Sequence, residues 1–239
     1  MDPRKIMYDC RLIGDFCIHC GKQPSDDCNS PKFNRDHIPS KVLLDKPYPE
    51  NLAVVFVCED CNNSLSLDEE YLACFMECVI SGSVNPEHIK REKIKRRLLE
   101  SPALSKLISE SMQVFPDGSI MWSPELDRIQ KVIEKLARGH VSVDYYKAPD
   151  VLERPSSIQI TPFQEMSREQ YDNFNSAHLG GLWPEVGVRA FERSAKEGEN
   201  SWQVVQKDRY RYMVSWQDQI VVRIALSEYL ACEVIWELE

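Results

Sequence analysis

Two pairs of cysteines with the spacing C-x-x-C lie in the first 61 residues of the chain. One pair is Cys17 and Cys20, and the other is Cys58 and Cys61. Each pair can span one edge of a tetrahedron, so together they have the ligand set of a structural Zn²⁺ site. Four thiolates leave no open position for a substrate, and the predicted role of this Zn²⁺ is to hold the fold together. The alternative is four unrelated buried thiols, which two such pairs in one short segment make the weaker interpretation.

A second group of residues, between and beside these cysteines, has the chemistry of phosphodiester hydrolysis. That reaction needs a base that activates water and a cation that neutralises the charge developing on the phosphate. His37 is a suitable base, because imidazole titrates near neutral pH. Its neighbour Asp36 offers the hard oxygen that Mg²⁺ or Mn²⁺ prefers, and Asn62 offers a second, neutral oxygen. Asn63 competes with Asn62 for this role, and Asn62 can alternatively cap a helix.

The residues Asp36-His37, Asn51-Leu52 and Asn62 resemble the HNH endonuclease family in their placement relative to the cysteine pairs. The family's pattern is an Asp-His or His-His pair, an Asn-Leu further on, and a His or Asn directly after the last cysteine. The variant with Asn in the last position is similar to junction-resolving phage endonucleases and to the HNH domain of CRISPR effectors. The resemblance covers roughly residues 15–75. It implies a ββα-metal nuclease on a zinc-bound treble clef that leaves 5′-phosphate and 3′-hydroxyl ends.

The same resemblance implies a role for each residue of the site. Asp36 and Asn62 would hold the catalytic Mg²⁺ or Mn²⁺, and His37 would be the general base. Asn51 would tie the hairpin loop together and orient His37, although it is alternatively an ordinary turn residue. In the family fold, Asp36 and His37 lie on the first strand of a hairpin. Successive strand residues point to opposite faces, so a bend or bulge is expected there to let both side chains serve one site.

The charge balance excludes a protein that binds nucleic acid over its whole surface. The chain has 29 basic and 38 acidic residues among 239, a formal net charge of −9, whereas such a binder would be basic. Any contact with DNA must therefore be local, assisted by metal or shared with a partner. The one basic cluster consists of Lys90, Arg91, Lys93, Lys95, Arg96 and Arg97. It either guides the phosphate backbone toward the site or is a solvated helix face, and these two interpretations stay open.

The pattern of elements predicts an α+β protein. Its expected segments are an HNH core in residues 1–82, a helical segment in 83–150 and a C-terminal α+β region in 151–239. A capping box at Ser66 and Glu69 predicts a helix over Leu67–Ile80. Apolar residues at helical spacing predict a second helix over Pro124–Arg138, and Gly139 would end it.

The C-terminal region is rich in β-branched and aromatic residues and predicts a small antiparallel meander. Polar breaks such as Lys207-Asp208 separate its strands. The expected strands are 158–163, 202–206, 209–216, 220–226 and 229–237, and a short helix is expected at 184–196. The edges of this sheet could pair with another protein, but an ordinary sheet is the favoured interpretation.

The remaining cysteines and histidines are weaker candidates. Cys74 and Cys78, one turn apart on an expected helix, are predicted to be core thiols. His19 lies inside the first cysteine pair and is expected to be exposed. Cys10 and Cys28 could replace a zinc ligand, but neither belongs to a pair. The other histidines, which have no ligand partner at a suitable spacing, are expected to be structural or on the surface: His88, His140 and His178.

These features predict a metal-dependent DNA endonuclease with structural Zn²⁺ and catalytic Mg²⁺ or Mn²⁺. A related hypothesis makes it the effector of a bacterial antiphage defence system, with a sensor or ATPase partner bound through the C-terminal region. The alternative is a non-catalytic zinc-stabilised module that binds nucleic acid or protein, which would have no need of Asp36, His37 and Asn62 together. The longest apolar run, Leu52–Cys58, is far shorter than the ~20 residues of a membrane helix. Since the start also lacks an export signal, no membrane contact and a cytoplasmic location are expected.

Overall fold

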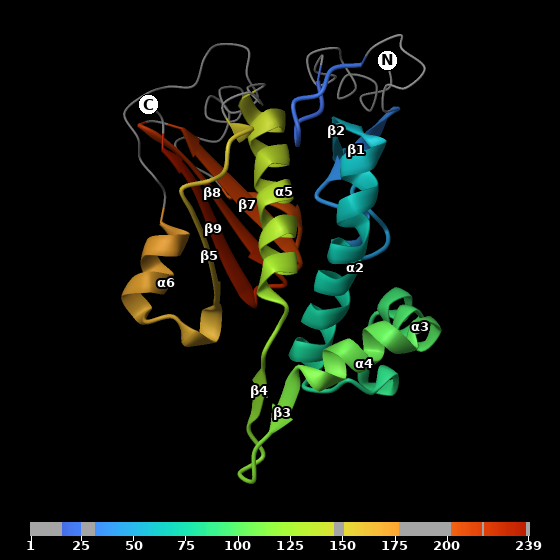
Figure 1. The fold of residues 1–239 in the computed structure, drawn as a ribbon. Coiled ribbons are helices and arrows are strands. Elements are labelled where there is room, and N and C mark those ends of the chain that lie inside the picture. Colours follow the sequence, from blue (N-terminus) through green and yellow to red (C-terminus); the bar gives the residue numbers. More distant parts are fainter. Residues whose placement is uncertain (1–15, 25–31, 146–150, 177–201, 217, 238–239) are drawn as a thin grey trace. The chain divides into compact units, whose positions relative to one another are not determined.

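The computed structural model describes residues 16–24, 32–145, 151–176, 202–216 and 218–237. Helices and strands are mixed along the chain, which confirms the α+β class. The chain forms two compact units, one of residues 1–63 and 133–239 and the other of residues 64–132. The three consecutive segments expected from the sequence do not coincide with these units. The reason is that the chain leaves the first unit along helix α2 (Glu59–Ser81) and returns along helix α5 (Leu126–Tyr145) (Figure 1).

The first unit begins with a hairpin that is followed directly by a helix. Strands β1 (Phe33–Ile38) and β2 (Ala53–Cys58) pair antiparallel, and their register is continuous from one end to the other. Helix α2 starts at the next residue, Glu59, and Glu59 and Asp60 place negative charge in its first turn, which suits a helix N-terminus. The helix therefore begins earlier than the capping box at Ser66 predicts, and Ser66 lies in its interior.

The C-terminal part of the first unit is a five-stranded antiparallel sheet of order β5-β9-β8-β7-β6, which confirms the predicted meander. Its strands are β5 (Ser157–Pro162), β6 (Gln203–Gln206), β7 (Tyr210–Trp216), β8 (Gln219–Leu226) and β9 (Leu230–Glu237). Ser227 and Glu228 between β8 and β9 have positive φ angles of 55° and 45°, the conformation that a tight hairpin turn requires at its two central residues. The helix expected at 184–196 lies outside the described residues.

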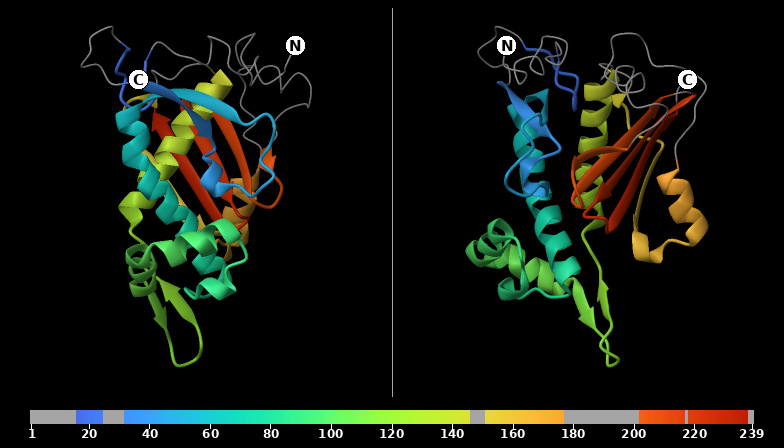
Figure 2. Two further views of the ribbon diagram at one scale, coloured as in Figure 1. Left: turned by 90° about the vertical axis from the view of Figure 1, so that its right-hand side faces the viewer. Right: turned by 180° about the vertical axis from the view of Figure 1, so that it is seen from behind.

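Helices cover both faces of this sheet (Figures 1 and 2). On one face lies α5, where the His140 ring stacks on Tyr212 with a centroid distance of 3.6 Å. His140 Nε2 is also hydrogen-bonded to the hydroxyl of Tyr210 at 2.7 Å. On the other face lies α6 (Arg168–Asn175), which packs through Phe174 on small residues of β8 and β9. The second half of α5 therefore packs directly on one face of the sheet.

Helix α5 does not stop at Gly139, where the sequence predicts its end, and continues to Tyr145. A Cβ atom at Gly139 would lie 2.5 Å from Cδ1 of Ile38 in β1. Glycine is therefore needed here for the close approach of α5 to the hairpin and does not act as a helix stop. Tertiary packing on both sides stabilises the helix through this position. In this unit α5 lies between the β1–β2 hairpin and the five-stranded sheet (Figure 1).

The second unit holds most of α2, helices α3 (Glu92–Glu100) and α4 (Pro102–Glu110), a hairpin and the first turns of α5. The hairpin consists of β3 (Met112–Val114) and β4 (Ile120–Trp122). The sequence analysis missed it within the segment expected to be helical, because three-residue strands are too short to show alternation. No helix in the described part of the chain is long and apolar enough to cross a membrane.

Cys74 and Cys78 lie buried in α2, as expected for core thiols. Burial raises the pKa of each thiol to about 12. Both side chains therefore stay protonated near neutral pH and behave as small apolar groups.

Candidate metal centre and the residues around it

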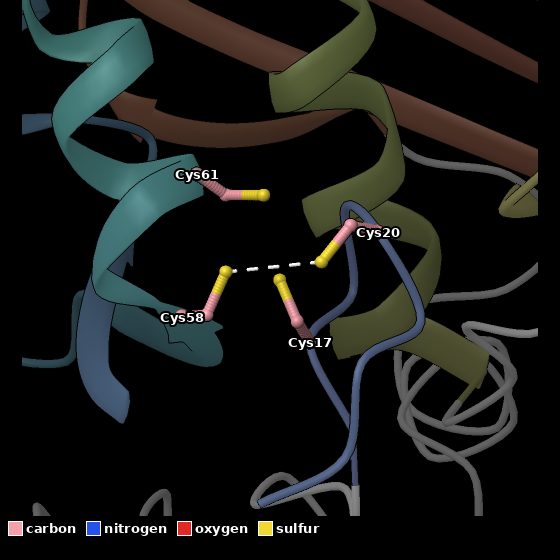
Figure 3. A group of neighbouring side chains, drawn as sticks. All are labelled: Cys17, Cys20, Cys58 and Cys61. Atoms are coloured by element: carbon pink, nitrogen blue, oxygen red, sulfur yellow. Dashed lines mark hydrogen bonds between the residues drawn. The ribbon is translucent and has the colours of Figure 1, made fainter. Parts of the chain in front are cut away.

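The four cysteines of the two C-x-x-C pairs meet at one point. Their Sγ atoms all lie within 4.8 Å of one another, and the side chains point to a common centre (Figure 3). Cys17 and Cys20 come from a tight turn, Cys58 is the last residue of β2, and Cys61 lies in the first turn of α2. Among the described residues, no other group of three or more cysteine, histidine or acidic side chains is arranged to hold a metal.

A local backbone turn presents the first pair. The amide of Gly21 donates to the carbonyl of Cys17 at 2.8 Å, and the amide of Cys17 donates to the carbonyl of Lys22, also at 2.8 Å. Gly21 has a φ of +71°, a conformation that glycine adopts without steric cost. These bonds fold the turn so that both thiols of the pair face the same side.

This geometry fits Zn²⁺. A tetrahedron with Zn–S bonds of about 2.3 Å has sulfur–sulfur edges of about 3.8 Å, and Cys20 Sγ and Cys58 Sγ are 3.7 Å apart. Burial, followed by the neighbouring thiols, raises the pKa of Cys61. A bound cation is therefore what would allow four thiolates to exist together at neutral pH.

His19, inside the first pair, is half-buried and not exposed as the sequence analysis expected. Its Nε2 atom is buried and has no hydrogen-bond partner. Burial, aided by the nearby charges of Lys135 and Arg138, lowers the pKa of His19 to about 3. Arg138 Nη1 donates to the carbonyl of His19 at 2.8 Å, so α5 supports the turn that carries the first two cysteines.

The side chain of Asn62 reaches the strand that carries Asp36 and His37. Asn62 lies in the first turn of α2, and its Nδ2 atom donates to Oδ1 of Asn34 in β1 at 3.2 Å. Asn34 and Asp36 are two residues apart on this strand, and they therefore share one face of it. The structure thus brings Asn62 to the face of β1 that bears Asp36.

Asp36 faces a residue that the sequence analysis did not consider. Its Oδ2 atom lies 2.6 Å from Nζ of Lys135 in α5, and the side chains are only 13% and 1% exposed. The available signal was a lysine among the apolar positions of a helix, next to Leu136 and close to Val132. Lysine is almost never fully buried unless it is paired, so a lysine at this position predicts an acidic partner.

His37 lies on the opposite face of β1 from Asp36. The β1–β2 ladder is continuous through this point, with Asp36 opposite Val55 and His37 opposite Val54. The bend or bulge that the family resemblance implies is therefore not present between them. The Nδ1 atom of His37 is buried without a hydrogen-bond partner. Burial lowers the pKa of His37, the charge of Lys41 lowers it further, and Asp36 acts in the opposite direction.

The second metal expected from the sequence would bind through Asp36 and Asn62. In the described arrangement the Asp36 carboxylate contacts the ammonium of Lys135, and the amide nitrogen of Asn62 donates to Asn34. These groups, as they stand, do not fit a divalent ion, because the Lys135 ammonium lies where such an ion would meet the carboxylate. Asn51 is exposed in the turn before β2, and no hydrogen bond joins it to His37 in the described part of the chain.

The basic cluster lies at the start of α3 and just before it. Most of its charges have acidic partners: Arg91 with Glu77 at 3.5 Å, Lys95 with Glu87 at 2.9 Å, Arg96 with Glu100 at 3.7 Å, and Arg97 with Glu70. Lys90 and Lys93 are exposed, and the described residues show no acidic partner for either. The positive charge that could meet a phosphate backbone is therefore smaller than the sequence suggests.

Comparison of the chain with protein-family models, with curated proteins and with solved structures finds no match. In the structure the four cysteines converge, Asn62 joins the face of Asp36, and His37 lies on the opposite face. The basic cluster belongs to the other unit.

Proposed function

We propose that this protein is an HNH-type, metal-dependent endonuclease that hydrolyses phosphodiester bonds in DNA. The observation that carries the proposal is the hydrogen bond of Asn62 to Asn34. It holds the first turn of α2 against the strand that bears Asp36 and His37. The cysteine cluster reinforces the same junction, because Cys58 ends β2 and Cys61 begins α2. The order of hairpin, cysteine cluster and helix thus supports the proposal, whereas Asp36 and His37 lie on opposite faces of β1.

The proposed roles follow from the chemistry of the side chains. Cys17, Cys20, Cys58 and Cys61 hold a structural Zn²⁺. His37 is the general base, since its lowered pKa keeps the imidazole neutral and able to accept a proton from water. Asp36 and Asn62 are the proposed ligands of Mg²⁺ or Mn²⁺, which would neutralise charge on the phosphate. To hold the ion, Asp36 must first lose the Lys135 ammonium that it contacts in the described arrangement. Asn51 keeps its proposed role in the hairpin loop.

DNA is the proposed partner, and the contact is confined to a small area because the chain as a whole is acidic. Lys90 and Lys93, with the exposed Arg96, are the proposed phosphate contacts on α3 and just before it. The same proposal includes a role as the effector of an antiphage system, in which a sensor or ATPase binds the C-terminal region. The five-stranded sheet supplies two edge strands, β5 and β6, for such a partner.

A second candidate function is a zinc-stabilised binding module without catalysis. The ion pair of Asp36 with Lys135 favours it, because an ammonium already compensates the carboxylate that a catalytic metal would need. The two functions differ in whether the phosphodiester bond is cut.

The experiment is cleavage of supercoiled plasmid by the purified full chain with Mg²⁺ or Mn²⁺. His37→Ala should lose about 10²–10⁴-fold in rate while keeping its Zn²⁺ and its melting temperature. His88→Ala, a change of an exposed histidine in the other unit, is the matched control and should cut like the wild type. Cleavage by His37→Ala at the wild-type rate would show that the base lies elsewhere. No cleavage by the wild type under either metal would favour the binding module.

A further inference from the structure

We propose that the ε-ammonium of Lys135 takes the cation position at Asp36, so that helix α5 competes with a divalent metal for this carboxylate. The inference rests on the proposed function in one respect only, the assignment of Asp36 as the metal ligand. It adds a regulatory element to that site. Metal can bind at Asp36 only when the ammonium withdraws.

The first support is the geometry of the pair. Lys135 Nζ and Asp36 Oδ2 are 2.6 Å apart, and the lysine side chain is almost fully removed from solvent. A carboxylate and an ammonium that are both buried are each costly without the other. The two charges therefore stabilise each other, and the Asp36 carboxylate is already paired before any metal binds.

The second support is the fixed position of the helix that carries Lys135. One turn further along α5, Gly139 packs so closely on Ile38 that a single added Cβ would lie 2.5 Å from the Ile38 side chain. Between them in sequence, Arg138 donates to the carbonyls of His19, Leu152 and Glu153 at 2.8, 3.1 and 3.1 Å. The helix is thus bound to the strand of Asp36 and to the first cysteine pair. The helix backbone therefore holds Lys135 next to Asp36, and the side chain is 1% exposed there.

The third support is that Asp36 and Ile38 share the face of β1 that α5 covers. A phosphate that approached Asp36 along this face would meet the helix. His37, on the opposite face, is outside this cover. The described arrangement is therefore a closed state of the Asp36 site, with the candidate base on the other face of the strand.

The test uses Mn²⁺ as the probe and the zinc-loaded full chain as the protein. The dissociation constant for Mn²⁺ is measured by electron paramagnetic resonance for the wild type and for Lys135→Met. This change keeps most of the volume and removes the charge. Left with a buried, uncompensated carboxylate, the variant should bind Mn²⁺ at least about tenfold more tightly than the wild type. The double variant Asp36→Asn, Lys135→Met should lose that gain.

Lys131→Met is the matched control, since Lys131 lies one turn earlier on α5 and is exposed. It should leave the Mn²⁺ affinity at the wild-type value. Zinc content and the melting temperature report whether each variant is folded. If Lys135→Met does not fold, Lys135→Gln replaces it, because an amide keeps a hydrogen-bond donor toward Asp36 without the charge. A folded Lys135 variant that binds Mn²⁺ no more tightly than the wild type overturns the inference.

Plasmid cleavage by the same proteins separates this inference from the proposed function. Tighter Mn²⁺ binding by the Lys135 variant without cleavage by any protein supports the competition and rejects the nuclease. Mn²⁺-dependent cleavage by the wild type with unchanged affinity in the variant rejects the competition and supports the nuclease.

Discussion

Asp36 and His37 are neighbours in the sequence and face opposite sides of the β1–β2 hairpin. The Asp36 carboxylate contacts the buried ammonium of Lys135 in helix α5. The His37 side chain lies on the opposite face, and burial lowers its pKa. An acidic ligand and a base that act on one phosphate must both reach it. The first strand of the hairpin therefore has to bend at this pair before the two can act together.

Removing one zinc ligand should unfold the hairpin end of the first unit. Cys58→Ser interrupts the cluster at the junction of β2 with α2, and a structural Zn²⁺ can contribute ~10–16 kcal/mol, more than the whole stability of a typical domain. We expect elemental analysis to find one Zn²⁺ per wild-type chain and none in the variant, with loss of β1–β2 amide protection.

Cys78→Ala is the control for this change, because Cys78 is a buried thiol outside the cluster. It should keep its Zn²⁺ even if its melting temperature falls. A wild-type chain purified without any Zn²⁺ would contradict the prediction.

Asn62→Ala should slow cleavage by about 10–100-fold, because it removes both a proposed ligand and the hydrogen bond to Asn34. A neutral amide contributes less charge than a carboxylate, so Asp36→Ala should be the more severe change. Raising the Mn²⁺ concentration should recover part of the rate in both. The measurement is the initial rate of plasmid nicking as a function of Mn²⁺.

Asn63→Ala is the neighbouring control and should cut nearly as well as the wild type. If Asn63→Ala cut more slowly than Asn62→Ala, the proposed metal ligand would be Asn63 and not Asn62. Asn34→Ala removes only the acceptor of the Asn62 hydrogen bond. It should lower the free energy of unfolding by about 1 kcal/mol.

Replacing Lys90 and Lys93 together by Ala should weaken DNA binding and reduce the slope of log affinity against log salt by about two. These two lysines are exposed and show no acidic partner among the described residues. By contrast, Arg97→Ala breaks an ion pair with Glu70 of α2, so it should lower stability more than it changes the salt slope. Titration of a labelled duplex at several salt concentrations gives both slopes. An unchanged slope in the double variant would identify α3 as a solvated face only.

Gly139→Ala should destabilise the first unit. Alanine is the better helix former by about 1 kcal/mol, but the added Cβ would overlap the Ile38 side chain, and overpacking of this kind costs about 1–3 kcal/mol. We expect a net loss of stability in denaturant unfolding. Lys131→Ala, at an exposed position of the same helix, should change stability little. A Gly139→Ala protein more stable than the wild type would show that α5 and β1 have room to separate.

Patterns that depend on neighbours in the sequence were readable without the structure. The four zinc ligands follow from the spacing of two C-x-x-C pairs, which the structure brings within 4.8 Å. Strands β7, β8 and β9 follow from β-branched and aromatic runs between polar breaks. Helix α5 follows from apolar residues at helical spacing. Helix α2 was predicted from the capping box at Ser66 and Glu69, although it begins earlier, at Glu59. In each case, the signal lies within a few turns or one strand, where local geometry decides which side chains share a face.

Contacts between distant segments were decided only by the tertiary structure. Gly139 looks like a helix stop, yet it is the point where α5 meets Ile38. Lys135 looks like an ordinary helix lysine, yet it is the buried partner of Asp36. Asn34 belongs to no motif in the sequence, yet its side chain accepts a hydrogen bond from Asn62. A buried charge or a close backbone approach depends on which element packs opposite. For Asp36 that partner, Lys135, is 99 residues further along the chain, so the local spacing of residues does not indicate it.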